Sequence, residues 1–161
     1  MTSPDPTMAA VAAAVSRGHA GHREEARGRL TALWRQVGSD GDPLLRVTIA
    51  HFLADLQDDA RDELSWDERA LSAVAELTDE LAQHHHAGLQ VRAFLPSLHL
   101  NVADCHRRLD DPVRAREHLA RAEQLVPELA DDAYGQLLRD GLRHVRDALD
   151  AGSTAPLASA P

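Results

Sequence analysis

The stretch of sequence that decides the fold is residues 99–127, HLNVADCHRRLDDPVRAREHLARAEQLVP. Small and apolar residues recur in it at helical spacing on both sides of the pair Asp111-Pro112. An aspartate caps the exposed amide groups at the start of a helix, and a proline at the first helical position loses no hydrogen bond. We therefore expect two antiparallel helices, the second of which begins at this pair.

The small residues of this stretch predict a close contact between the two helices. Ala103 lies on the first segment, and Ala115 and Ala122 lie on the second. Side chains of this size let two helix axes approach to roughly 8–10 Å. Val102 and Leu119 are expected to fill the space between them.

The same spacing resembles a tetratricopeptide repeat, a helix pair that stacks with its neighbours into a solenoid. The positions that carry the resemblance are His99, Val102, Ala103, His106, Ala115, Leu119, Ala122 and Pro127. At these offsets the family has aromatic, leucine, small, aromatic, alanine, aromatic, alanine and proline residues. Two histidines and a leucine stand here for the three aromatic residues. An ordinary helical hairpin is the alternative interpretation.

Earlier parts of the chain repeat the pattern more weakly. One match comprises Ala14, Ala26, Leu30 and Leu33, with Gly21 where a turn glycine falls in the family. A looser match comprises Ala50, Glu63 and Ala70. Helices are expected over about residues 6–17, 22–37, 62–83, 88–109 and 129–150, with two more opened by Asp42-Pro43 and Asp111-Pro112. Pro96 is expected to bend the helix over 88–109 or to break it near Leu95.

These patterns predict an all-α protein of about seven helices. The resemblance implies a right-handed α-solenoid of about three divergent tetratricopeptide-like helix pairs plus a C-terminal capping helix. Aromatic residues make up 3% of the chain and isoleucine occurs once, which argues against a sheet and for a core of Leu, Ala and Val. We expect a single domain over residues 1–150 and a disordered tail over 151–161, because the tail is small, polar and contains proline.

Composition also restricts the partners. The formal net charge of −9 argues against general nucleic-acid binding. No run of residues is long enough to span a bilayer, and the apolar run over 8–15 indicates a helix rather than a signal peptide. Cys105 is the only cysteine, so no internal disulfide is expected, and we interpret it as a core residue rather than a catalytic thiol. A cytoplasmic protein that binds neither membrane nor nucleic acid is therefore expected.

The resemblance implies non-catalytic binding of a protein or peptide in a concave groove lined by the first helix of each pair. Neither enzymatic activity nor a cofactor is expected. The residues expected to line this groove are His51, Asp55, Ser97, Leu100, Asn101, Asp104, Arg107 and Arg108. Asn101 with Arg107 resembles the clamp that holds a peptide's terminal carboxylate in some members of the family.

Ten histidines suggest a second class of function, a helical domain that binds a metal or a small molecule. Residues 84–86 are consecutive histidines, and His51 with Asp55, or His99 with His106, share a helix face. A zinc site needs three or four converging ligands, and these spacings do not supply them, so no metal site is expected. An accessory protein of a biosynthetic pathway, with a pocket in the groove, is a further alternative.

Charge is unevenly distributed along the chain. The acidic residues of 55–68, which we call the acidic belt, are Asp55, Asp58, Asp59, Asp62, Glu63, Asp67 and Glu68. The basic residues of the later stretch are Arg107, Arg108, Arg114, Arg116 and Arg121. The belt is expected to be either a solvated face or a docking surface for a basic partner. Self-association into a homodimer through the arginine-rich stretch is the alternative.

Overall fold

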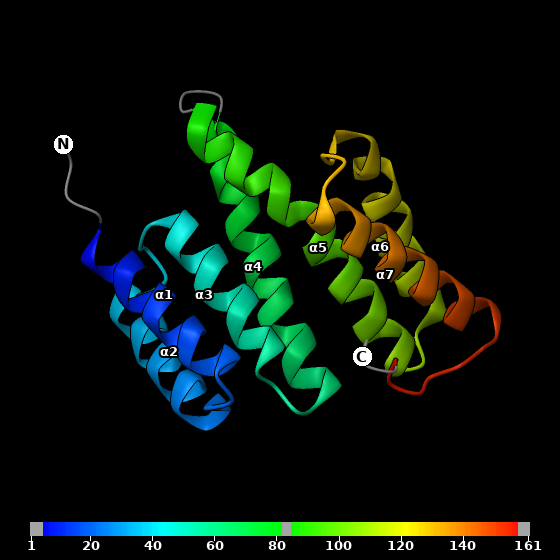
Figure 1. Ribbon diagram of the computed structural model, residues 1–161, viewed down its shortest axis with the longest axis horizontal. Coiled ribbons are helices and arrows are strands. Elements are labelled where there is room, and N and C mark those ends of the chain that lie inside the picture. The colour runs from blue at the N-terminus through cyan, green and yellow to red at the C-terminus, as the bar shows by residue number, and fades with distance from the viewer. Residues whose placement is uncertain (1–4, 82–84, 158–161) are drawn as a thin grey trace. The chain divides into compact units, whose positions relative to one another are not determined.

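The computed structural model describes the backbone of residues 5–81 and 85–157, and the side chains of these residues except 78–93 and 128. Within these ranges the protein is all-α, with seven α-helices packed mostly in consecutive pairs (Figure 1). The helices are α1 (Pro6–His19), α2 (Arg23–Val37), α3 (Pro43–Asp55), α4 (Ala60–Leu81), α5 (His85–Arg108), α6 (Pro112–Leu125) and α7 (Ala133–Asp150). The prediction of an all-α fold is confirmed, whereas the solenoid arrangement stays a prediction.

The chain divides into two compact units, Met1–His84 and His85–Pro161. The prediction of a single domain over 1–150 therefore stays a prediction, and each unit is described by itself. No helix in the described part of the chain is both long and apolar enough to cross a membrane.

Aspartate-proline pairs start three of the helices. The Oδ1 atom of Asp5 accepts a hydrogen bond from the backbone N–H of Thr7 at 2.8 Å. Asp42 caps α3 through the N–H of Leu44 at 2.8 Å, and Asp111 caps α6 through the N–H of residue 114 at 3.2 Å. Each aspartate satisfies an amide group that the first turn leaves free, while the following proline has none to satisfy.

Two short turns let consecutive helices fold back on one another. After α1, Gly21 has φ +95°, and after α5, Asp110 has φ +61°. Around Asp110, the N–H of Asp111 donates to the carbonyl of His106 at 2.8 Å, so the turn satisfies the last carbonyl groups of α5. Asp110 therefore adopts a left-handed conformation that glycine takes at a lower cost.

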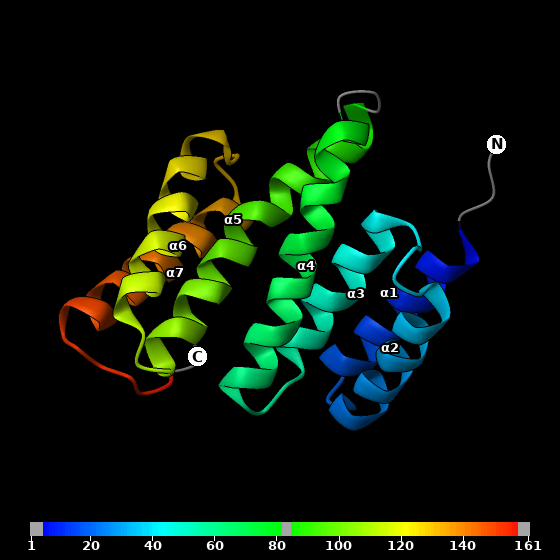
Figure 2. The same cartoon turned by 180° about the vertical axis from the view of Figure 1, so that it is seen from behind.

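The first unit packs α1 against α2, α2 against α3, and α3 against α4, as Figure 2 shows from the reverse side. Its core comprises Val11, Ala14, Ala26, Leu30, Leu45, Ile49, Leu53 and Leu56. Ala14, Ala26 and Leu30 have no exposed surface, as their spacing predicted. The rings of Trp34 and Trp66 meet edge to face with centroids 5.2 Å apart, so they join α2 to α4.

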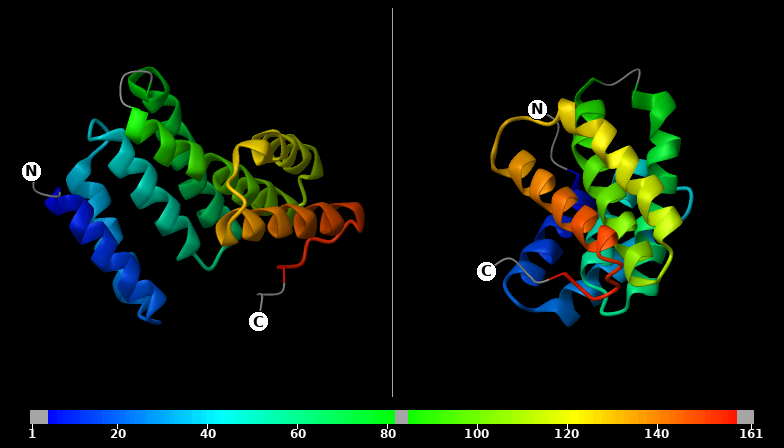
Figure 3. Two further views of the ribbon diagram at one scale, coloured as in Figure 1. Left: turned by 45° about the horizontal axis from the view of Figure 1, so that its top comes forward. Right: turned by 90° about the vertical axis from the view of Figure 1, so that its right-hand side faces the viewer.

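The second unit pairs α5 with α6 and places α7 against both; in Figure 3, α6 is yellow and α7 is orange. Its core comprises Leu100, Ala103, Ala115, Leu119, Ala122, Leu138, Leu142, Val145 and Leu149. The three alanines are fully buried, so the small residues do lie in the packed core as predicted. On α7, a Cβ atom at Gly141 would lie 2.8 Å from a methyl carbon of Leu100, which shows how closely α7 approaches α5.

Two details differ from the sequence expectation. The helix α5 runs through Pro96 from His85 to Arg108, so the alternative of a break near Leu95 is wrong. The last helix begins at Ala133 rather than near residue 129. A short 3-10 helix, Val126–Glu128, contains the proline, and Asp132 then caps α7 through the N–H of Gly135 at 2.8 Å.

Candidate functional site

A cavity of about 100 Å³ lies among α1, α2 and α3 in the first unit. We call it the Asp55 pocket. Its lining residues are Val15, Gly18, His19, Arg23, Leu30, Phe52, Asp55 and Leu56. Most of its wall is apolar, and its polar groups are one carboxylate, one guanidinium and one imidazole. Such a combination of apolar walls and few polar groups is typical of a binding site.

Three helix ends meet at the Asp55 pocket. His19 is the last residue of α1, Arg23 is the first of α2, and Asp55 is the last of α3. The turn at Gly21 brings the first two ends together, and the packing of α2 against α3 adds the third. The polar groups therefore gather where three helix ends meet, while apolar side chains from α1, α2 and α3 form the walls.

The charge of Asp55 is balanced between burial and nearby cations. Asp55 as a residue is exposed at the end of α3, but the packing around its carboxyl raises the pKa of this group to about 6, and His19 and Arg23 act in the opposite direction. The guanidinium of Arg23 donates to the backbone carbonyl of Asp55 at 3.5 Å and also forms an ion pair with Asp58 at 3.6 Å. Arg27 contacts Asp58 at 3.6 Å as well. Asp58 thus offsets charge on α2, and Asp55 carries a negative charge above pH 6.

His51 lies one turn before Asp55 on α3, but its ring is buried, with 7% of the residue exposed. Its Nδ1 atom lies 4.0 Å from the carboxylate of Asp67 on α4. Burial lowers the pKa of the ring to about 4. His51 is therefore a neutral residue of the α3–α4 interface, whereas Asp55 lines the pocket.

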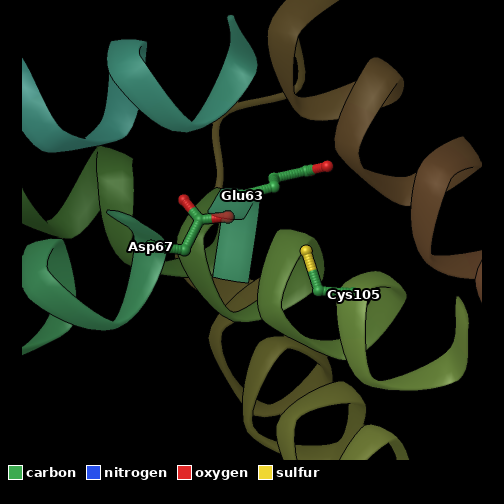
Figure 4. Close-up of side chains that lie close together, drawn as sticks. All are labelled: Glu63, Asp67 and Cys105. Carbon is green, nitrogen blue, oxygen red and sulfur yellow. The ribbon is translucent and has the colours of Figure 1, made fainter. Parts of the chain in front are cut away.

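The acidic belt is not one solvated face. Figure 4 shows Glu63 and Asp67 one turn apart on α4. Asp67 has no exposed surface, so this member of the belt is not solvated. Asp59 accepts a hydrogen bond from the N–H of Arg61 at 2.6 Å at the start of α4. Among the described residues, these carboxylates thus have structural contacts that the run of acidic letters did not predict.

The expected groove residues of the second unit form a cluster near the end of α5. The carboxylate of Asp104 accepts hydrogen bonds from Arg107 at 2.7 Å and from Arg108 at 2.9 Å. Arg107 is 2% exposed and also donates to the backbone carbonyl of Ser153 at 2.7 Å. Its guanidinium therefore holds the segment after α7 in place, which leaves little of it for a peptide carboxylate. The resemblance of Asn101 and Arg107 to a carboxylate clamp is not supported by this geometry.

The remaining groove positions on α5 have different surroundings. Leu100 lies in the core beneath α7. Ser97 forms a hydrogen bond with the hydroxyl of Tyr134 on α7, and Asn101 is half-buried. The eight expected groove residues thus fall into two sets, His51 and Asp55 in the first unit and six residues in the second. Their placement in a common groove stays a prediction.

Three histidine rings stack between α5 and α6. The Nδ1 atoms of His99 and His118 lie 3.1 Å apart, with ring centroids at 5.4 Å. His106 also stacks on His118, with centroids 5.7 Å apart. Burial lowers the pKa of His99 to about 4, with smaller contributions from His118 and Arg121. The expected pair of His99 and His106 is therefore joined by a third ring that the sequence analysis did not single out.

Other expected features have simpler positions. Cys105 is a buried residue of α5 whose Sγ accepts a hydrogen bond from Arg108 at 3.5 Å, in line with its interpretation as a core residue. Of the consecutive histidines, residue 84 lies outside the described residues, as do the side chains of residues 85 and 86. In the arginine-rich stretch, Arg116 pairs with Asp150 at 3.1 Å, and Arg114 lies 3.6 Å from Asp111.

A second, more open hollow of about 400 Å³ lies between α6 and α7. Its lining residues are Glu123, Val126, Arg139, Leu142, Arg143 and Arg146. Arg146 forms an ion pair with Glu123, and Arg143 pairs with Asp140 at 2.9 Å. The positive charge of this hollow is thus largely offset by neighbouring carboxylates, which makes it a weaker candidate than the Asp55 pocket.

Comparison with protein-family models, with curated proteins and with solved structures finds no match. The relation to tetratricopeptide repeats therefore stays a prediction from the sequence. The residues that sequence analysis missed at the pocket, His19 and Arg23, flank the turn over 20–22, which contains Gly21. Their position beside a tight turn, which brings two helix ends together, is the sequence feature that could have indicated a shared site.

Proposed function

We propose that this protein is a non-catalytic module that binds a polypeptide segment of a partner protein. In this proposal the Asp55 pocket receives one side chain that has an apolar stem and a basic tip. The observation that carries the proposal is the pocket itself, because it combines apolar walls with a carboxylate at the meeting point of three helix ends.

The chemistry of the pocket favours a lysine or arginine side chain. Such a side chain buries its methylene groups along apolar surface and keeps its charged group near a polar partner. The walls from Val15, Leu30 and Phe52 suit the methylene groups, and Asp55 suits the charge. Asp58 pairs with Arg23 and Arg27 and so neutralises part of the positive charge of α2. The carboxylate of Asp55 can then pair with a bound basic side chain.

The arrangement of the helices supports a binding role of the tetratricopeptide type. The pairs α1–α2, α3–α4 and α5–α6 follow one another along the chain, and buried alanines occur in all three. Proteins built from such pairs commonly present a surface to a peptide or protein partner. The resemblance and the pocket thus point to the same class of function by independent routes.

The proposal predicts that binding depends on the charge of Asp55. Peptides are first selected from a random display library against the immobilised wild-type protein, and calorimetry then measures their affinity. Asp55→Asn, which keeps the shape of the side chain, should weaken binding about tenfold, because a hydrogen bond to a charged group is lost. Asp62→Asn removes the same charge at an exposed position of the acidic belt outside the pocket lining and serves as the matched control.

The selected peptides should contain lysine or arginine, and their affinity should fall as the pH drops below about 6, where Asp55 becomes protonated. The proposal fails if no peptide is enriched over repeated rounds. It also fails if Asp55→Asn binds the selected peptides as tightly as the wild type and the Asp62→Asn control do.

A further inference from the structure

We propose that the partner side chain in the Asp55 pocket is an arginine, whose guanidinium binds both carboxylate oxygens of Asp55. This inference rests on the function proposed above and narrows the partner's residue from two basic side chains to one. Arginine and lysine carry the same charge, but a guanidinium and an ammonium need different sets of hydrogen-bond acceptors and lose different amounts of hydration. The acceptors and walls of the pocket suit the guanidinium.

The carboxylate of Asp55 has both oxygens available to a ligand. Within the described part of the chain, no hydrogen bond or ion pair reaches these oxygens. The nearby guanidinium of Arg23 donates instead to the backbone carbonyl of Asp55 at 3.5 Å and pairs with Asp58 at 3.6 Å. A guanidinium presents two parallel N–H donors that match the two oxygens of a carboxylate, and such bidentate pairs are among the strong hydrogen bonds of proteins.

Backbone carbonyl groups at the helix ends around the pocket already accept hydrogen bonds. At the end of α1, the carbonyl of Gly18 accepts from the N–H of Gly21 at 3.1 Å. At the end of α3, the carbonyl of Asp55 accepts from Arg23. A lysine ammonium has three N–H donors that point in different directions, so a carboxylate alone cannot satisfy them. An ammonium in the pocket would therefore have to share acceptors that are already engaged.

The walls of the pocket suit the flat faces of a guanidinium. Val15, Leu30 and Phe52 line the cavity and offer aliphatic and aromatic surface. A guanidinium is weakly hydrated and stacks on aromatic faces, whereas an ammonium is a compact and strongly hydrated charge. A phenyl ring also attracts a cation through the negative face of its π-system. Arginine thus loses less hydration than lysine on entering the pocket and gains more contact with its walls.

The test compares arginine with lysine in the peptide, so the fold of the protein is not altered. The probe is the tightest peptide selected from the random library, made with either residue at its basic position, and calorimetry at pH 7 measures both affinities. The lysine peptide should bind about tenfold more weakly, because one hydrogen bond to the carboxylate is lost. Asp55→Asn should remove most of this difference, whereas the Asp62→Asn control should keep it.

A second variant tests the aromatic wall. Phe52→Leu keeps an apolar lining but removes the ring, and circular dichroism establishes that the variant is folded. The preference for arginine over lysine should fall about two- to fivefold in this variant, because the ring face no longer contacts the guanidinium.

Two results would overturn the inference and leave the proposed function in place. One is a lysine peptide that binds as tightly as the arginine peptide or more tightly. The other is a preference for arginine that survives Asp55→Asn, because the two carboxylate oxygens would then not be its cause. If no peptide is enriched from the library, the proposed function fails and this inference fails with it.

Discussion

Replacing His51 with glutamine should remove a large part of the acid sensitivity of the first unit. The ring is 7% exposed, and its burial lowers the pKa from 6.5 to about 4. The unfolded chain therefore binds a proton at this residue as the pH falls through 6.5, while the folded chain does not until about pH 4. The stabilising contribution is complete above pH 6.5 and is lost progressively between pH 6.5 and 4.

The size of the effect follows from the two pKa values of His51. Their difference corresponds to about 3 kcal/mol of folding free energy when the loss is complete. At pH 5 the linkage relation gives a loss of about 2 kcal/mol relative to pH 7. Domains are typically stable by about 5–15 kcal/mol, so this loss is a substantial fraction of the total.

Asp55 acts in the opposite direction in the same pH range. Because its pKa is raised to about 6, the folded state holds a proton more readily than the unfolded chain. Its contribution to stability is present at low pH and is lost as the pH rises from about 4 to 6. The informative quantity is therefore the difference between wild type and His51→Gln at each pH, in which the contribution of Asp55 cancels.

Tryptophan fluorescence during urea unfolding measures this difference for the first unit alone. Both tryptophans of the chain, Trp34 and Trp66, lie in this unit. The free energy of unfolding falls by about 2 kcal/mol per molar urea. Between pH 7 and pH 5, the urea midpoint of the wild type should therefore fall by about 1 M more than that of His51→Gln. If the urea midpoints of the two proteins differed by the same amount at every pH, the reasoning would be refuted.

Three further substitutions or truncations test the packing. Ala115→Arg should destabilise the second unit by more than about 1–3 kcal/mol, because it overfills a fully buried position and buries a charge; a circular dichroism melt within a degree of wild type would contradict the helix contact. Asp110→Gly should stabilise the protein by about 0.5–1 kcal/mol because φ is +61° there, and a lower melting temperature would refute that account. Deleting residues 151–161 should lower the denaturation midpoint because Arg107 loses the carbonyl of residue 153. Deleting only 158–161 should not, and equal midpoints for the two truncations would contradict the role of that contact.

Local chemistry explains which parts of the fold were predictable. Alanines at helical spacing predicted the buried positions of Ala14, Ala26 and Ala115, because only small side chains fit where two helices touch. The aspartate-proline pairs predicted helix starts because the cap and the proline act within one turn. The start of α7 was not predictable in this way, since apolar residues around position 129 continue the pattern past the turn that the proline forms.

The candidate sites depend on contacts that spacing does not reveal. The Asp55 pocket forms because three helix ends meet, and only one of its polar residues was expected to bind anything. The contact of His99 with His118 depends on how α5 and α6 rotate about one another, and their separation of 19 residues matches no helical period. In the sequence Asp67 is one more charge in an acidic run, whereas in the structure it has no exposed surface.

The most direct test of the proposed function is to locate a bound peptide on the protein by methyl NMR. The peptide is the tightest binder selected from the random library, titrated into wild-type protein at pH 7. The proposal predicts that the methyl signals of Val15, Leu30 and Leu56, which line the Asp55 pocket, shift most. Shifts confined to methyl groups elsewhere, such as the exposed Leu137 on α7, would contradict it.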